Sequence, residues 1–212
     1  MRTRAVNCAI VIGMRLRGML LILFVSACGD DGSSTTTDGS TTGDGGGSGS
    51  DAAMIDAAPI VGEPPELVGI TEAHNAIRAM VQTQTPLPAL AWSDALEATA
   101  KTYGMMCLNA DGNSIMDHNP NRSMGHPYYV GENIYASGGT ATGQAAVAKW
   151  AEEKANYHYP DGYSAQTGHY TQIVWRTTRE VGCALVNCPN IGFPSTVICD
   201  YGPGGNSGGA PY

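Results

Sequence analysis

Helical periodicity governs the first half of the predicted globular part of the chain, residues 63–212. Apolar positions recur every three or four residues between 67 and 81, and this segment ends before a proline-rich run. The same spacing continues from a capping pair at Ser93-Asp94 to Cys107, and it returns at about residues 142–157. The pattern therefore predicts three helices.

Strand-like patterns dominate after the third predicted helix. The runs TQIVWRT, EVGCALVNC and STVICDY cover residues 171–177, 180–188 and 195–201, and turn-sized breaks separate them. Short runs of this kind, rich in β-branched residues and closely spaced, are typical of strands in an antiparallel meander. Helices followed by strands predict an α+β fold.

The first 28 residues have the composition of an export signal. Four arginines and no acidic residue accompany the apolar run 18–27, which is too short to span a bilayer as a helix. The end of this run with the next residue, Val25-Ser26-Ala27-Cys28, is similar to the bacterial lipobox, in which the cysteine is lipidated and becomes the mature N-terminus. Translation from Met14 would leave a complete short signal. Cleavage near Ala27 with an unmodified Cys28 is the alternative.

Residues 29–62 predict a flexible linker. They are mostly Gly, Ser, Thr, Asp and Ala, with six aspartates and no basic residue. Such a segment cannot bury enough apolar surface to fold. A linker of this kind is what a tethered domain needs, so the sequence favours a cell-envelope lipoprotein anchored to the membrane through Cys28 over a released extracellular protein.

The acidic charge of the chain bears on its partners. The net charge is −8, and residues 63–212 alone carry 7 basic and 13 acidic residues. An acidic domain is repelled by phosphate backbones, which excludes nucleic acid as the expected partner. Cations and neutral ligands remain compatible with this charge.

Four cysteines in the predicted domain, Cys107, Cys183, Cys188 and Cys199, indicate two disulfides in an exported chain. Three pairings are open at this point. A zinc site is the alternative use of four cysteines, but the domain has no CxxC pair, so disulfides are preferred.

Five short motifs follow one another through the domain: HNAIR at 74–78, GENIY at 131–135, WAEEK at 150–154, GHYTQIVW at 168–175 and CDYGPGGN at 199–206. In this order they resemble the CAP superfamily of cysteine-rich secretory, antigen 5 and plant pathogenesis-related class-one proteins. The resemblance covers about residues 66–212 and is closest to the plant members near the C-terminus. It implies a monomeric α-β-α sandwich, with an antiparallel sheet of about three strands between helices and a large open cleft. It also pairs Cys183 with Cys199 and Cys107 with Cys188.

The resemblance further implies two histidines and two glutamates on the cleft floor. Matched motif by motif, these are His118, Glu132, Glu153 and His169, with His126 as the alternative to His118. Neutral imidazoles bind zinc or a similar divalent cation, and two of them leave coordination positions for water. Carboxylates beside them can orient the rings or exchange protons with that water.

Three function classes follow from this resemblance. The first is a non-enzymatic module that binds a lipid, a sterol or another small ligand, with a divalent-metal site in its cleft. The second is a surface interaction or adhesion domain, and the third is a metal-dependent hydrolase. The sequence has no HExxH motif and no Ser or Cys in a recognisable catalytic setting, so the binding module is preferred and no catalytic residue is assigned.

Overall fold

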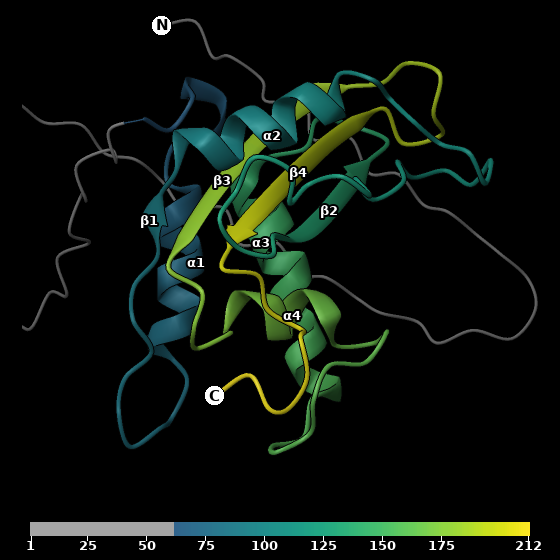
Figure 1. Cartoon of the computed structure of the whole chain (residues 1–212). Helices are drawn as coiled ribbons and strands as arrows, with labels where there is room; N and C mark the ends of the chain where they lie inside the picture. Colours follow the sequence, from purple (N-terminus) through teal and green to yellow (C-terminus); the bar gives the residue numbers. More distant parts are fainter. Residues whose placement is uncertain (1–61) are drawn as a thin grey trace, which may run out of the picture. The chain divides into compact units, whose positions relative to one another are not determined.

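A four-stranded sheet forms the centre of the domain in the computed structural model, which describes residues 62–212 (Figure 1). The predicted signal at 1–28 and residues 29–61 of the predicted linker lie outside the described residues. The elements follow one another as η1 Pro65–Leu67, α1 Ile70–Ala79, β1 Ala91–Trp92, α2 Asp94–Gly104, β2 Gly131–Ser137, α3 Gly143–Glu152, η2 Glu153–Asn156, α4 Gly168–Ile173, β3 Glu180–Asn187 and β4 Ser195–Gly202. Within 62–212, no helix has the length and apolar character needed to cross a membrane.

The strands are arranged in the order β1-β3-β4-β2. Strand β4 lies between β3 and β2 and pairs antiparallel with both, which gives the three-stranded antiparallel sheet that the resemblance implies, although the strand pattern did not predict β2. A fourth strand, the two-residue β1, pairs in parallel with β3. Every residue of β4 after Ser195 is buried, as expected for a central strand that is covered on both faces.

Helices cover both faces of the sheet, with α2 on one face and α1, α3 and α4 on the other (Figure 1). The approach of α2 is close because two glycines face the contact. A Cβ on Gly104 would lie 2.7 Å from Cδ1 of Ile198, and a Cβ on Gly182 would collide with the backbone of Ser93 and Glu97. This arrangement confirms the α-β-α sandwich within an α+β fold.

The HNAIR motif of α1 is structural. Arg78 is buried and donates hydrogen bonds to the carbonyls of Pro88, Ile173 and Trp175 at 2.8, 2.7 and 2.9 Å. Burial, with the nearby Arg179, lowers its pKa to about 10. One charged side chain thus ties α1 to the end of α4 and to the segment after it, and it satisfies three backbone acceptors in the interior.

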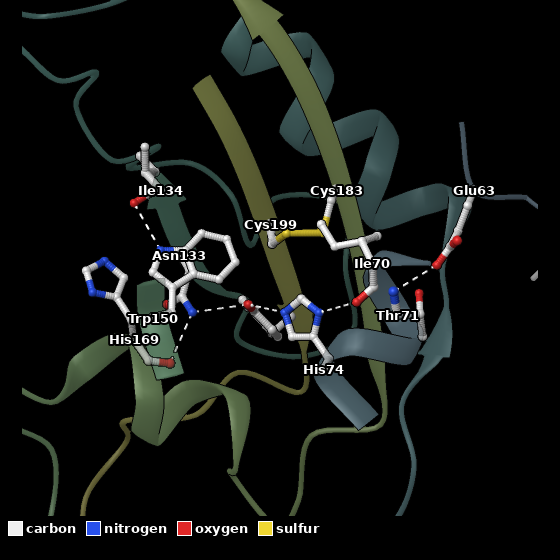
Figure 2. The surroundings of a disulfide bond; sticks show 11 residues. Glu63, Ile70, Thr71, His74, Asn133, Ile134, Trp150, His169, Cys183 and Cys199 are labelled. Atoms are coloured by element: carbon white, nitrogen blue, oxygen red, sulfur yellow. Dashed lines mark hydrogen bonds between the residues drawn. A yellow bond between two sulfur atoms is a disulfide. The ribbon is translucent and has the colours of Figure 1, made fainter. Parts of the chain in front are cut away.

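His74, also in this motif, is buried between α1 and β4 (Figure 2). Its Nδ1 donates to the Ile70 carbonyl at 2.8 Å, so its Nε2 is the acceptor for the hydroxyl of Tyr201 at 2.8 Å. Burial lowers the pKa of His74 to about 4, and the ring is therefore neutral at physiological pH. His74 acts as a hydrogen-bonded core residue.

Two disulfides join Cys107 to Cys188 and Cys183 to Cys199, which are the two pairs that the resemblance implies. Cys183 and Cys199 stand directly opposite each other on β3 and β4 (Figure 2). The other bridge connects the segment after α2 to the end of β3. It thereby anchors one end of the loop that leads to His118.

The predicted strand at residues 171–177 is wrong. Its first three residues belong to α4, and Val174 to Thr178 form turns. The carboxylate of Glu153 accepts hydrogen bonds from the backbone N–H groups of His169 and Tyr170 at 2.8 and 3.1 Å, which satisfies donors that a helix N-terminus leaves open. Residues 170–175 are all buried, so the apolar run is the interior of a short helix and its continuation.

The three predicted helices are present with shifted ends. The helix predicted at 67–81 is α1 at Ile70–Ala79, preceded by Gly69 with a φ of 86°. The second ends at Gly104 rather than at Cys107. The third is α helical from Gly143 to Glu152 and continues as the 3-10 helix η2.

Candidate histidine–glutamate site at the edge of the sheet

The first histidine–glutamate pair joins α4 to the start of η2. Nδ1 of His169 lies 2.6 Å from Oε1 of Glu153, whose Oε2 accepts the two α4 amides. Burial raises the pKa of Glu153, but the hydrogen bonds from the His169 ring and these amides outweigh it, so the pKa lies below its ordinary value. Glu153 is therefore ionised at neutral pH. It holds the His169 ring by Nδ1 and leaves Nε2 available.

The ring of His169 has two further supports (Figure 2). The buried indole of Trp150 stacks on it with 6.1 Å between centroids and 12° between planes, and the indole N–H donates to the Ile134 carbonyl. Asn133 donates to the His169 carbonyl and to the Tyr201 hydroxyl, both at 3.1 Å. A chain of hydrogen bonds therefore runs from His169 to the core histidine, His74.

The second pair lies on β2 and the loop before it. Nδ1 of His118 is 2.6 Å from Oε1 of Glu132, which also accepts the backbone N–H of Asn119 at 3.0 Å. The hydroxyl of Tyr103 donates to the carbonyls of Asp117 and His118, both at 3.0 Å, and so holds the loop against α2. The side chain of Glu132 is 0% exposed, whereas that of His118 is 59% exposed.

His126, the alternative to His118, lies elsewhere. Its Nε2 is 2.9 Å from the Thr99 hydroxyl of α2, and its ring stacks on Tyr128 with 5.9 Å between centroids. The structure therefore places His118 beside Glu132, and it places His126 against helix α2.

The two pairs approach the edge strand β2 from opposite faces of the sheet. Glu132 and Asn133 are neighbours on β2, so their side chains point to opposite faces. Glu132 faces the α2 side, and Asn133 contacts His169 on the other side. His169 and His118 line separate hollows of about 450 and 400 Å³. Within residues 62–212, no three His, Cys, Asp or Glu side chains converge on one point as metal ligands would.

A comparison with models of protein families shows to which family the chain belongs. The model of the "CAP: Cysteine-rich secretory protein family" matches residues 71–201, which is more than half of the chain. The chain belongs to the CAP family.

Known CAP proteins resemble the chain over most of the described domain. Pathogenesis-related protein 1 of Arabidopsis thaliana is 37% identical over 135 residues, which are 63% of this chain and 74% of that protein. Pathogenesis-related protein 1A of Nicotiana tabacum is 38% identical over 146 residues, 66% of this chain and 77% of that protein. Among solved structures, that of NaASP2 with Zn²⁺ matches with a TM-score of 0.53 and 27% identity, over 68% of this chain and 83% of that one.

Two features of this CAP domain have no signal in the motif pattern. The first is Asp200, which stands directly opposite Glu132 in the register of β2 and β4 and is fully buried. An aspartate inside the CDYGPGGN motif is unremarkable as sequence. Only the strand pairing places it against a second buried carboxyl group.

The second feature is a groove of about 940 Å³ between the end of α1 and α4. Its wall includes Met80, Val81, Tyr159, Tyr170 and Tyr212, with Lys154 and Arg176 as the charged side chains. The rings of Tyr159 and Tyr212 stack at 5.6 Å. The Tyr170 hydroxyl is buried without a hydrogen-bond partner among the described residues. These residues are far apart in the sequence, so only the fold reveals the groove.

Proposed function

We propose that this CAP-domain chain is an exported, non-enzymatic binding module that takes up a lipid, a sterol or another small apolar ligand. The groove between α1 and α4 is the observation that carries the proposal. Its volume of about 940 Å³ falls in the range of about 300–1,000 Å³ that is common for small-molecule sites. Its walls combine three tyrosines and two aliphatic side chains with the polar side chains of residues 82–85, a mixed lining that suits an amphiphile better than a wholly apolar molecule.

The charges around the groove favour an amphiphile with an anionic head. Lys154 and Arg176 line it, and none of its described lining residues has a carboxylate side chain. A fatty acid therefore fits the groove better than a neutral sterol of similar size.

Displacement of a fluorescent long-chain fatty acid from the purified protein tests this. Met80 is 59% exposed, so Met80→Trp fills the groove without disturbing the core, and it is expected to weaken binding about tenfold or more. Lys154→Gln should weaken fatty-acid binding by up to about fivefold, the size of one exposed ion pair, and leave sterol binding unchanged. Lys101→Gln, on α2, is the matched control.

If the wild type bound neither fatty acid nor sterol, the ligand-binding proposal would be wrong. The interaction domain would then replace it, with the exposed Met105, Met106 and Leu108 beside α2 as the surface to examine.

The two histidines support a divalent-cation site in the same module. Each ring is held at Nδ1 by a carboxylate that also accepts a backbone amide, which fixes Nε2 as the free ligand atom. Because the two rings line separate hollows, joint coordination of zinc or a similar cation through both Nε2 atoms, with water in the remaining positions, would require the exposed His118 ring to turn towards His169. Bound there, the cation would supply a positive charge that polarises a ligand oxygen or a water. NaASP2, whose structure was solved with Zn²⁺, is a relative with this fold.

Calorimetric titration with zinc chloride tests the cation site. Affinity is expected to fall as the pH drops through about 6.5, because the imidazoles must be deprotonated to bind. His118→Ala and His169→Ala should each weaken binding severely, whereas Glu132→Gln and Glu153→Gln should cost about 10- to 100-fold. Unchanged affinity in all four variants would make both pairs structural. Peptide turnover that His169→Ala abolishes would instead support the hydrolase.

Export rests on residues 1–28, with support from the two disulfides, since these bonds persist in oxidising compartments. The lipid anchor rests on Cys28 alone. Metabolic labelling with a fatty acid should mark the wild type and not Cys28→Ala. Soluble export of an unlabelled wild type would rule out the anchor and leave export itself in place.

A further inference from the structure

Glu132 and Asp200 form a pair of carboxyl groups inside the protein. They are register partners on the antiparallel strands β2 and β4, and directly opposite side chains on such strands lie about 4.5–5.5 Å apart at Cβ. The side chain of Glu132 and the whole of Asp200 are 0% exposed. Bulk solvent therefore does not reach the two groups.

Hydrogen bonding within the pair is unequal. Oε1 of Glu132 accepts from the His118 ring and from the Asn119 amide, but its Oε2 has no partner among the described residues. Neither carboxyl oxygen of Asp200 has a partner there either. Three buried, unsatisfied oxygens on two facing side chains are a large cost if both groups are ionised, and one proton between them removes most of it.

The surrounding charges do not neutralise this pair. Arg122, in the loop before β2, is the nearby cation, but its nitrogens donate to Val130, Asn119 and the Tyr129 hydroxyl. On the α2 side, Tyr103 lies near Glu132 and is a neutral phenol at physiological pH. The His118 ring is hydrogen-bonded to Oε1 of Glu132, and Oε2 is the oxygen without a partner among the described residues.

The hydrogen-bond donors around the two carboxyl groups indicate which of them carries the proton. Two N–H groups point at Oε1 of Glu132, and among the described residues none points at Asp200, so Asp200 is the carboxyl group that lacks any other donor. Burial, followed by the charge of Glu132, raises the pKa of Asp200 to about 9, although Arg122 lowers it. Asp200 is thus the group that stays protonated.

We propose that Asp200 carries a proton at neutral pH and donates it to Oε2 of Glu132, which makes Asp200 a positioning residue for the Glu132–His118 pair. With both oxygens of Glu132 engaged, its side chain is held in the orientation that points Oε1 at Nδ1 of His118. Asp200 touches neither the ring nor its free Nε2, so it acts through Glu132.

Infrared spectroscopy of the protein at pH 7 tests the proton directly. The wild type should show the carbonyl band of a buried, protonated carboxyl group. Asp200→Asn should remove this band, and Asp161→Asn, at an exposed aspartate, should retain it. A wild type without the band, or a band that persists in Asp200→Asn, would overturn the proposal.

Stability against pH gives a second test. The pKa of Asp200 is raised on folding, so its contribution is complete below the ordinary value of 3.8 and is lost as the pH rises towards about 9. An asparagine at position 200 has nearly the same shape as the aspartate, and its amide is an N–H donor at every pH. The melting temperature of Asp200→Asn should therefore be compared with that of the wild type at each pH. This difference should be more positive at pH 8 than at pH 4 by roughly 5 °C or more. An equal effect at both pH values would contradict a protonated Asp200.

The positioning role has a separate readout in the His118 ring. Nuclear magnetic resonance of labelled histidine should show the Nδ1–H tautomer of His118 in the wild type and in Asp200→Asn. Asp200→Ala removes the donor to Oε2, so the Glu132 side chain should be held less firmly and the tautomer preference of His118 should weaken. If His118 were unchanged in a folded Asp200→Ala, the positioning role would be wrong.

Discussion

The His169–Glu153 and His118–Glu132 pairs have the same Nδ1–Oε1 distance of 2.6 Å, but their surroundings differ. Glu153 is ionised and fully engaged by donors, and its histidine is held by a stacked indole. Glu132 is more deeply buried, lies against Asp200, and supports a histidine whose side chain is mostly exposed. A pairwise distance therefore does not describe the site. The two rings differ in what fixes them, so they should respond to different substitutions.

Loss of the Cys107–Cys188 bridge is expected to have the largest effect and to act on the His118 side alone. The bridge closes a sequence separation of 81, which corresponds to about 4.5 kcal/mol of unfolding free energy on the loop-entropy model. Denaturant unfolding of the double Ala variant measures this loss. Histidine resonances should then broaden for His118 and not for His169. Equal broadening of both would show that the two sides are not independent.

Trp150→Ala should act on the His169 side. Trp150 is among the largest fully buried side chains, and its removal is expected to cost about 3–5 kcal/mol of unfolding free energy. The His169 ring loses its stacking partner, so its resonances should shift while those of His118 stay in place. Thermal unfolding combined with histidine spectra checks both parts. A shift at His118 of similar size would contradict the separation of the two sides.

Glu153→Ala should destabilise the domain by about 1–3 kcal/mol, because two amides at the start of α4 lose their acceptor. Glu153→Gln keeps an acceptor but loses the charge. Since folding lowers the pKa of Glu153, the wild type should exceed this variant in stability at neutral pH. The difference should vanish as the pH falls below the folded pKa.

Urea unfolding at several pH values measures the comparison, with Glu152→Gln as the matched control. Glu152 is exposed and forms an ion pair with Lys149, so its loss should cost less than about 1 kcal/mol. A pH-independent difference between the wild type and Glu153→Gln would contradict the ionised cap.

His126→Ala should have the smallest effect. It removes one hydrogen bond to Thr99 and a stacking contact with Tyr128, worth about 1 kcal/mol of unfolding free energy. Zinc affinity and the spectra of His118 and His169 should not change. Loss of zinc binding in this variant, with His118→Ala unaffected, would move the site from His118 to His126.

The sequence motifs proposed Glu132 and Glu153 for the cleft floor and left His118 and His126 as competing candidates beside His169. The α+β class, the antiparallel sheet and the helices could be predicted because apolar periodicity is a local property. The disulfide pairs and the family came from five motifs in order rather than from periodicity. The failure at residues 171–177 has a different origin. Glu153 lies 16 residues from the helix N-terminus it caps, and the run is buried on all sides, so no polar face marked it as a helix.

What the sequence by itself determined is the set of candidate side chains: His118, His126 and His169, Glu132 and Glu153, the four cysteines of the domain and a set of apolar positions. Tertiary structure decided which of them meet. It placed Asp200 against Glu132 across 68 residues and set His126 against α2 instead of Glu132. It also assembled the groove from the end of α1, the region of α4 and the C-terminal Tyr212. The physical reason is that hydrogen-bond partners, burial and the charge state of a carboxyl group depend on distant segments, and local patterns carry no record of them.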